Sequence, residues 1–228
     1  MLIKPPNIVL PDMKAFFTTK HFCRENVPLS MALSEELNIP ERNIYMPVQK
    51  HTNRVHVLKS DCEPVTADAV VTSRENLLIG VIVADCVPVL LYDREKRVIG
   101  AVHAGWRGTA AGILKETIKL MGSDFNSLQS DIQVAIGPSI RQCSYEVDEK
   151  VKTEVQRATG EGAYYKRHAE KYFLDLSTAN KIQALHAGVL PENIWQSEEC
   201  TFCNPEKYYS YRYLKGSEGR QGGFIGIW

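Results

Sequence analysis

The segment at residues 77–108, LLIGVIVADCVPVLLYDREKRVIGAVHAGWRG, constrains the fold more than any other part of the sequence. It contains apolar runs at residues 77–84, 87–92 and 98–102. Continuous runs of Leu, Ile and Val are typical of strands that are buried on both faces. Four charged residues at positions 93–96 separate the second run from the third, which favours a β-hairpin. The sequence therefore predicts a buried sheet on which the other elements pack.

The register of this hairpin determines which polar side chains meet. If Tyr92 pairs with Arg97, then Cys86 lies directly opposite His103. Facing residues of an antiparallel pair have Cβ atoms about 4.5–5.5 Å apart, close enough for a thiolate and an imidazole to share a proton or a metal ion. A slip of one residue would place the two side chains on opposite faces. We therefore expect a Cys–His pair at the open end of the hairpin.

Composition excludes several classes of protein. The 228 residues contain 27 Lys plus Arg and 27 Asp plus Glu, so the basic excess of a nucleic-acid binder is absent. No apolar run approaches the ~20 residues of a membrane span, and prolines at positions 5 and 6 interrupt any signal core near the start. We expect a cytoplasmic monomer with one domain over residues 1–228, a small-molecule ligand, and no nucleic-acid or membrane partner. In that compartment the six cysteines stay reduced.

The other elements mix strands and helices without a strict β-α-β alternation, which predicts an α+β fold with mixed sheets. Strands are expected at residues 8–10, 15–18, 43–46, 55–59, 69–72, 132–136, 208–213 and 223–228. Helices are expected at residues 30–38 with Ser30 as the N-cap, and at 109–121, 148–158 and 175–187.

His51, Cys86 and His103 all follow or end strand-like segments. Two imidazoles and a thiolate form a tetrahedral zinc set whose fourth position is open to water or substrate. Each residue also has a simpler interpretation, since a buried cysteine is most often a packing residue and a histidine at a strand end usually bonds to a backbone carbonyl. The predicted opposition of Cys86 and His103 favours the metal site.

Three further residues are candidates for the same site. Arg107 lies in a Gly-Trp-Arg-Gly corner before a predicted helix, where a guanidinium and backbone N–H groups suit an anion; a salt-bridged surface arginine fits the same position. Arg220 lies in a second glycine-rich segment. Asp85 neighbours Cys86 and could orient a ligand, act as an acid or base, or cap a strand end.

The pair Cys200 and Cys203 forms a C-x-x-C pattern, which is typical of a zinc knuckle or a redox pair. No second pair with suitable spacing follows it, so we assign no functional metal to this pattern.

Several motifs together resemble the YfiH / laccase-domain family. The most specific are ADCVPV at residues 84–89 and VHAGWRGT at residues 102–109. Weaker matches are QKH at 49–51, AIGPSI at 135–140 with Cys143 and YEV at 145–147, LDL at 174–176 with Ala179 and Asn180, Cys200-Thr201, YSYR at 209–212, and Gly219-Arg220. The resemblance runs from about residue 49 to the end. Residues 18–30 depart from it, because a loop of the family is shortened there.

The resemblance implies a four-layer α/β/β/α sandwich and a zinc site at the positions of His51, Cys86 and His103. It also implies purine nucleoside phosphorylase activity, in which adenosine, inosine, guanosine or methylthioadenosine is cleaved by phosphate, and adenosine deaminase activity. Catalytic roles then fall to Cys86, His103, His51 and Asp85, and substrate binding to Arg107 and Arg220. Six histidines are too few for a multicopper oxidase, so the older laccase label is discounted.

Two other functions remain open. Cys86 and His103 could act without metal as nucleophile and base, in a hydrolase or amidase for a small or cell-wall precursor substrate. Zinc could also serve only as a structural staple. Zinc binding that requires His51 favours the phosphorylase or the staple, and one low-pKa thiol in metal-free protein favours the hydrolase.

Overall fold

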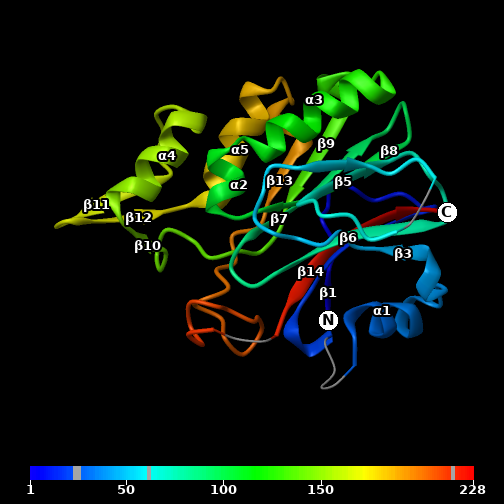
Figure 1. Cartoon of the computed structure of the whole chain (residues 1–228), viewed down its shortest axis with the longest axis horizontal. Helices are drawn as coiled ribbons and strands as arrows, with labels where there is room; N and C mark the ends of the chain where they lie inside the picture. Colours follow the sequence, from blue (N-terminus) through cyan, green and yellow to red (C-terminus); the bar gives the residue numbers. More distant parts are fainter. Residues whose placement is uncertain (23–26, 61–62, 217–218) are drawn as a thin grey trace.

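The computed structural model describes residues 1–22, 27–60, 63–216 and 219–228, and two large sheets pack face to face in it (Figure 1). The shortened loop expected near the N-terminus includes residues 23–26, which lie outside these ranges. The first sheet has the order β1 (Leu2–Ile3), β2 (Met13–Thr18), β14 (Gln221–Ile227), β6 (Leu77–Val83), β3 (Ile44–Tyr45). The second has the order β13 (Ile194–Gln196), β9 (Ile132–Ile136), β7 (Val87–Asp93), β8 (Val98–Ala104), β5 (Ala69–Thr72), β4 (Val55–Val57).

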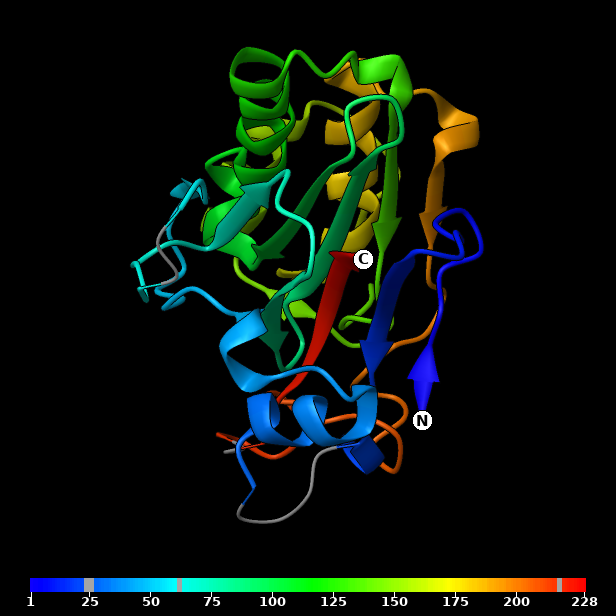
Figure 2. The same ribbon diagram turned by 90° about the vertical axis from the view of Figure 1, so that its right-hand side faces the viewer.

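Helices cover the outer face of each sheet. The first sheet carries α1 (Leu29–Leu37), whose Ala32 and Leu33 pack against Leu78 and Phe224. The second sheet carries α2 (Trp106–Ala110), α3 (Ile113–Phe125), α4 (Glu149–Thr159) and α5 (Leu176–His186). Figure 2 shows α1 and α3 at opposite ends of the stack with the sheets between them. This arrangement confirms the four-layer α/β/β/α sandwich.

The continuous apolar runs are explained by burial on both faces. In β7, Leu90 points into the core between the sheets, whereas Val89 and Leu91 pack towards the helices. In β6, Ile79 and Val81 face the same inter-sheet core. Burying one such side chain stabilises the fold by about 1.5–3 kcal/mol, so the hairpin at the centre of the second sheet is a rigid base for the loops at its end.

Both sheets are mixed, as predicted. β3 pairs with β6, β4 with β5 and β13 with β9 in parallel, while the other neighbours are antiparallel. A small third sheet has the order β10 (Glu146–Val147), β12 (Lys171–Leu174), β11 (Tyr165–His168). No helix in the described part of the chain is long and apolar enough to cross a bilayer.

The predicted register of the hairpin is wrong by two residues. Asp93 pairs with Val98, and Pro88 rather than Cys86 lies opposite His103. The cause is the turn, where Asp93 Oδ1 accepts hydrogen bonds from the N–H groups of Glu95 and Lys96 at 2.8 and 3.0 Å. Asp93 is therefore the last paired residue. A shift of two residues preserves the face of the sheet, so Cys86 and His103 remain neighbours on a diagonal.

Other boundaries differ from the sequence expectations. Residues 8–10 form no strand, and α1 begins at Leu29 with Pro28 rather than Ser30 at its N-cap. The helix expected at residues 109–121 is divided into α2 and α3, because Gly112 adopts a positive φ of 71° between them. Residues 208–213 form an irregular segment that ends in a turn at residues 211–213, instead of a strand. The chain there satisfies its N–H groups with side chains, since Tyr209 N donates to Gln221 Oε1 and Arg212 N donates to Asp85 Oδ2.

Candidate metal centre

His51, Cys86 and His103 meet at the open end of the β7–β8 hairpin. Their ligand atoms all lie within 4.8 Å of one another, and the two imidazole rings have an edge-to-face arrangement with centroids 4.8 Å apart. We call these three residues the central cluster. The structure brings together the three residues that the sequence analysis named as one site.

Unusual backbone conformations direct the side chains of His51 and Cys86 towards the central cluster. His51 has a φ of 58° in the loop before β4, and Asp85, just before Cys86, has a φ of 82°. Gly105 follows β8 where a Cβ atom would lie 3.0 Å from Cys86 Sγ and 3.2 Å from His51 Cδ2. A side chain at this position would force the sulfur and the ring to move by a few tenths of an ångström, which favours the Gly of the HAGWRG motif.

Asp68 holds two residues of the central cluster in place through hydrogen bonds, and the sequence analysis did not identify it. This fully buried carboxylate bonds His103 Nδ1 at 2.8 Å. It also accepts hydrogen bonds from the backbone N–H groups of His51 and Thr52 at 3.0 and 2.6 Å. Since Nδ1 is engaged, His103 offers Nε2 to the centre, as in the carboxylate–histidine pairs behind metal-bound imidazoles. The sequence signal for this role was an Asp directly before the apolar strand at residues 69–72.

The electrostatics of the cluster favour charged side chains. Burial raises the pKa of Cys86, but the positive charge of His103 and hydrogen bonds from His103 and His51 lower it by more, to about 6. Burial lowers the pKa of His103, but the Cys86 charge and the Asp68 hydrogen bond raise it by more, to about 9. Burial likewise raises the pKa of Asp68, yet hydrogen bonds from His103 and Thr52 hold it well below its usual range. Without a metal, the pair is a thiolate and an imidazolium at neutral pH.

The residues present fit a metal ion. Two imidazole nitrogens and one thiolate sulfur converge, one imidazole is oriented by a buried carboxylate, and three ligands leave one position open. The described chain thus contains a metal-capable His/Cys centre, at the positions that the sequence predicted.

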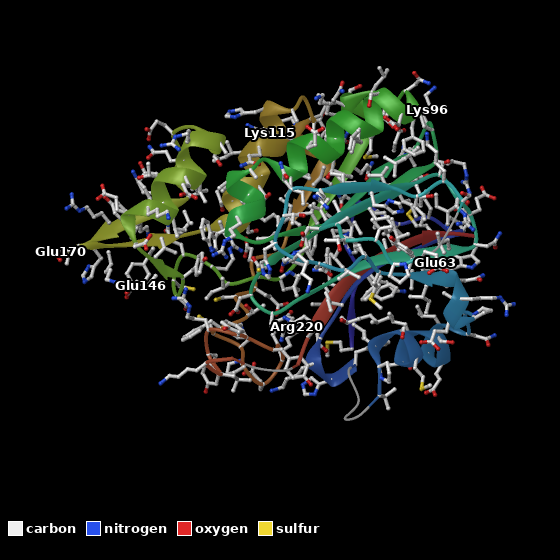
Figure 3. All side chains as sticks on the ribbon, viewed as in Figure 1. Glu63, Lys96, Lys115, Glu146, Glu170 and Arg220 are labelled. Carbon is white, nitrogen blue, oxygen red and sulfur yellow. The ribbon has the colours of Figure 1, made fainter. Side chains whose placement is uncertain are left out.

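The open side of the centre faces a cavity of about 550 Å³. Its lining includes the predicted residues Asp85, Arg107 and Arg220, together with Tyr145, Tyr211 and Arg212, for which sequence analysis gave no role. Figure 3 labels Arg220 where the chain enters β14, far from Lys96 at the tip of the hairpin. Three guanidinium groups therefore border one cavity.

Each arginine has a supporting contact. The Arg107 guanidinium lies over the ring of Trp106, 4.4 Å from the centroid. Arg212 stacks over Tyr145 at 5.1 Å and donates to the carbonyl of Glu146 at 2.9 Å. Arg220 donates to the carbonyl of Gly219 at 2.7 Å. The short α2 that carries Arg107 is anchored from behind, because the buried Asn180 of α5 donates to Thr109 Oγ1 at 2.9 Å.

Asp85 holds the cavity wall. Its Oδ1 accepts a hydrogen bond from Thr201 Oγ1 at 2.6 Å, and its Oδ2 accepts one from Arg212 N at 2.7 Å. Both carboxylate oxygens are thus engaged in fixing the C-terminal loops against the end of the hairpin.

The fold and the site define an α/β/β/α sandwich protein with a metal-capable His/Cys centre at the end of its central hairpin. Comparison with known proteins identifies the family. Residues 24–228 match the family described as multi-copper polyphenol oxidoreductase laccase. The chain belongs to this family, which is the one that the sequence motifs resemble.

Relatives and solved structures agree with this assignment. A protein of Clostridium acetobutylicum named purine nucleoside phosphorylase is 41% identical over 179 residues, which cover 78% of this chain and 74% of the relative. The crystal structure of YlmD from Geobacillus stearothermophilus is 30% identical, has a TM-score of 0.89, and matches 97% of this chain and 93% of that one. The structure of YfiH from Bacillus licheniformis is 27% identical, has a TM-score of 0.87, and matches 95% of this chain and 93% of that one.

Proposed function

We propose that this chain is a zinc-dependent purine nucleoside phosphorylase that converts a purine nucleoside and phosphate to the free base and ribose 1-phosphate. The observation that carries the proposal is the opening of a metal-capable His/Cys centre into a cavity bordered by three arginines. The name of the Clostridium acetobutylicum relative supports the same reaction.

Zinc suits the donor set of the central cluster. His51, Cys86 and His103 would hold it, and Asp68 would keep His103 in the required tautomer. Two histidines and a cysteine also occur in blue-copper sites, which serve electron transfer. Phosphorolysis changes no oxidation state, so the redox-inert zinc ion is the better fit. A bound zinc ion supplies a positive charge that stabilises negative charge on an oxygen or nitrogen of the substrates.

The arginines suit phosphate. In phosphorolysis a phosphate oxygen forms a bond to C1′ of the ribose, the bond from C1′ to the purine breaks, and the bonding electron pair leaves with the purine. The proton released by hydrogen phosphate balances the proton that the purine gains. Arg107, Arg212 and Arg220 can hold the anion by charge-assisted hydrogen bonds, which fixes the attacking oxygen near C1′.

Tyrosines suit the purine. Tyr211 and Tyr145 both line the cavity, where an aromatic ring can stack on the base. Burial and the nearby Cys86 charge raise the pKa of Tyr145 to about 12, so its hydroxyl keeps its proton and can donate to the departing base. Asp85 positions this wall through Thr201 and Arg212; a direct acid or base role for Asp85 stays a prediction.

The test is the identity of the product. Adenosine is incubated with purified protein, with and without phosphate, and the bases are separated by chromatography beside a Cys86→Ala control whose folding is checked by circular dichroism. Phosphate-dependent adenine that is absent from the control supports the proposal. Phosphate-independent inosine would instead identify adenosine deamination, and no product from the folded wild type would contradict a nucleoside reaction.

A metal-free Cys/His hydrolase or amidase is the second candidate, because the thiol of Cys86 has a pKa of about 6 beside His103. The two candidates differ in their response to metal removal. Stripping the metal abolishes phosphorolysis if the zinc proposal holds, whereas it exposes the thiolate and activates a cysteine hydrolase.

A further inference from the structure

Three thiols converge outside the central cluster, from two segments far apart in the sequence. Cys143 lies in the loop between β9 and β10, and Cys200 and Cys203 lie in the turns that follow β13. Their sulfur atoms all lie within 4.8 Å of one another, and Cys143 Sγ is 3.5 Å from Cys203 Sγ. We call these three residues the thiol cluster. The sequence showed the C-x-x-C pair but gave no sign that Cys143 joins it.

The sulfur spacing matches ligands of one ion. Two thiolates on a tetrahedral zinc, each about 2.3 Å from the metal, lie roughly 3.8 Å apart. A disulfide would instead bring two sulfurs to ~2.05 Å and leave the third without a role. Cys143 and Cys203 are exposed while Cys200 is buried, so a fourth position on the solvent side is open to water.

The surrounding backbone fixes the two segments together. Ser139 and Cys200 form a parallel bridge, in which Thr201 N donates to the Ser139 carbonyl at 3.1 Å. Asn204 Nδ2 donates to the Cys200 carbonyl at 2.8 Å and closes the turn around the C-x-x-C pair. The hydroxyl of Ser144 lies beside the three sulfurs, 3.1 Å from Cys203 Sγ, 3.6 Å from Cys143 Sγ and 4.0 Å from Cys200 Sγ.

We propose that Cys143, Cys200 and Cys203 bind a second zinc ion, separate from the central cluster, which clamps the β9–β10 loop to the C-terminal loops. The clamp acts on the cavity wall through the neighbours of its ligands. Tyr145 lines the cavity two residues after Cys143, and Thr201, next to Cys200, bonds Asp85. This site is structural, and it does not depend on the reaction that the central cluster catalyses.

The experiment counts metal in four proteins: wild type, Cys86→Ser, Cys203→Ser and the double variant. Each is purified with a reductant, stripped with a chelator, loaded with Zn²⁺ alone and measured by mass spectrometry of the metal after desalting. We expect two, one, one and no zinc ions per chain. Co²⁺ loading gives an independent readout, because sulfur-to-cobalt charge-transfer absorption should persist in Cys86→Ser and vanish in the double variant.

Three outcomes would overturn the second site. Cys86→Ser could bind no metal, Cys203→Ser could bind as much as wild type, or a thiol titration of protein isolated without reductant could show two fewer thiols than after reduction. The last result, with peptide mapping that places both lost thiols at Cys143 and Cys203, would identify a disulfide between them. These measurements record metal and thiols only, so their failure is separate from any failure of the phosphorylase proposal.

Discussion

The central cluster and the thiol cluster use cysteine in different surroundings. The central cluster combines one thiol with two imidazoles, is backed by the buried Asp68, and opens into a cavity bordered by arginines. The thiol cluster has three sulfurs on two loops, and the hydroxyl of Ser144 contacts two of them, Cys143 Sγ and Cys203 Sγ. Both ligand sets leave one position open, but that of the central cluster faces the cavity, whereas that of the thiol cluster faces solvent. The central cluster therefore suits chemistry on a substrate, and the thiol cluster suits the joining of two loops. Surroundings rather than residue type distinguish the two clusters.

Among the substitutions that would distinguish the two clusters, Asp68→Asn is expected to change zinc affinity the most. The amide cannot supply the negative charge that orients and polarises His103, and loss of such a carboxylate typically costs 10–100-fold in metal affinity or activity. We expect this loss at the central cluster and unchanged zinc at the thiol cluster, measured by competition with a chromophoric chelator.

Asp93→Asn is the matched control, because Asp93 is also fully buried but caps the far end of the hairpin. Equal losses in both variants would show that Asp68 acts through general stability. Unchanged central zinc in Asp68→Asn would contradict its orienting role.

A smaller effect is expected from Arg212→Ala. Removing one charge-assisted contact to phosphate should raise the KM for phosphate at least about 10-fold, equivalent to ~1.4 kcal/mol, with a smaller change in the KM for nucleoside. Steady-state kinetics at varied phosphate measure this. Arg94→Ala, exposed in the hairpin turn, is the control, and identical constants for the two variants would remove Arg212 from the phosphate site.

The smallest effect concerns thiol reactivity in metal-free protein. At pH 7 Cys86 is a thiolate because its pKa is about 6, whereas the pKa of Cys143 is about 11. We expect iodoacetamide to modify Cys86 about 3- to 10-fold faster than Cys143, a difference limited by the greater exposure of Cys143. The Cys86 rate should rise from pH 5 to 7 and then level off. Peptide mapping measures both rates, and faster labelling of Cys143 would contradict the charge assignment.

Local signals predicted much of the fold. Strands β5 and β9 were predicted with the observed bounds, because each is a short apolar run between polar residues. Asp148 and Asp175 cap α4 and α5 by accepting hydrogen bonds from backbone N–H groups three residues on, which is a signal visible within one turn. Strands β11 and β12 were missed because β11 has no apolar run and the apolar part of β12 is only three residues long.

Contacts between distant residues could not be predicted in the same way. The hairpin register depends on how Asp93 bonds its turn, and the role of Asp68 depends on contacts across 16 to 35 positions. Cys143 and Cys203 lie 60 positions apart. The central cluster was predicted because the incorrect register still placed Cys86 and His103 on the same face of the sheet. Tyr211 and Arg212 were not predicted, because they lie in a loop whose sequence resembled a strand and whose position depends on side-chain contacts with Asp85 and Gln221.

The most direct test of the account compares ribose 1-phosphate formation by Cys86→Ser and Cys203→Ser under identical conditions. We predict no product above background from Cys86→Ser. For Cys203→Ser we predict turnover within about 10-fold of wild type, with the loss mainly in KM because the cavity wall loosens. Full turnover by Cys86→Ser, or complete loss in a folded Cys203→Ser protein together with activity in Cys86→Ser, would contradict the assignment of chemistry to the central cluster.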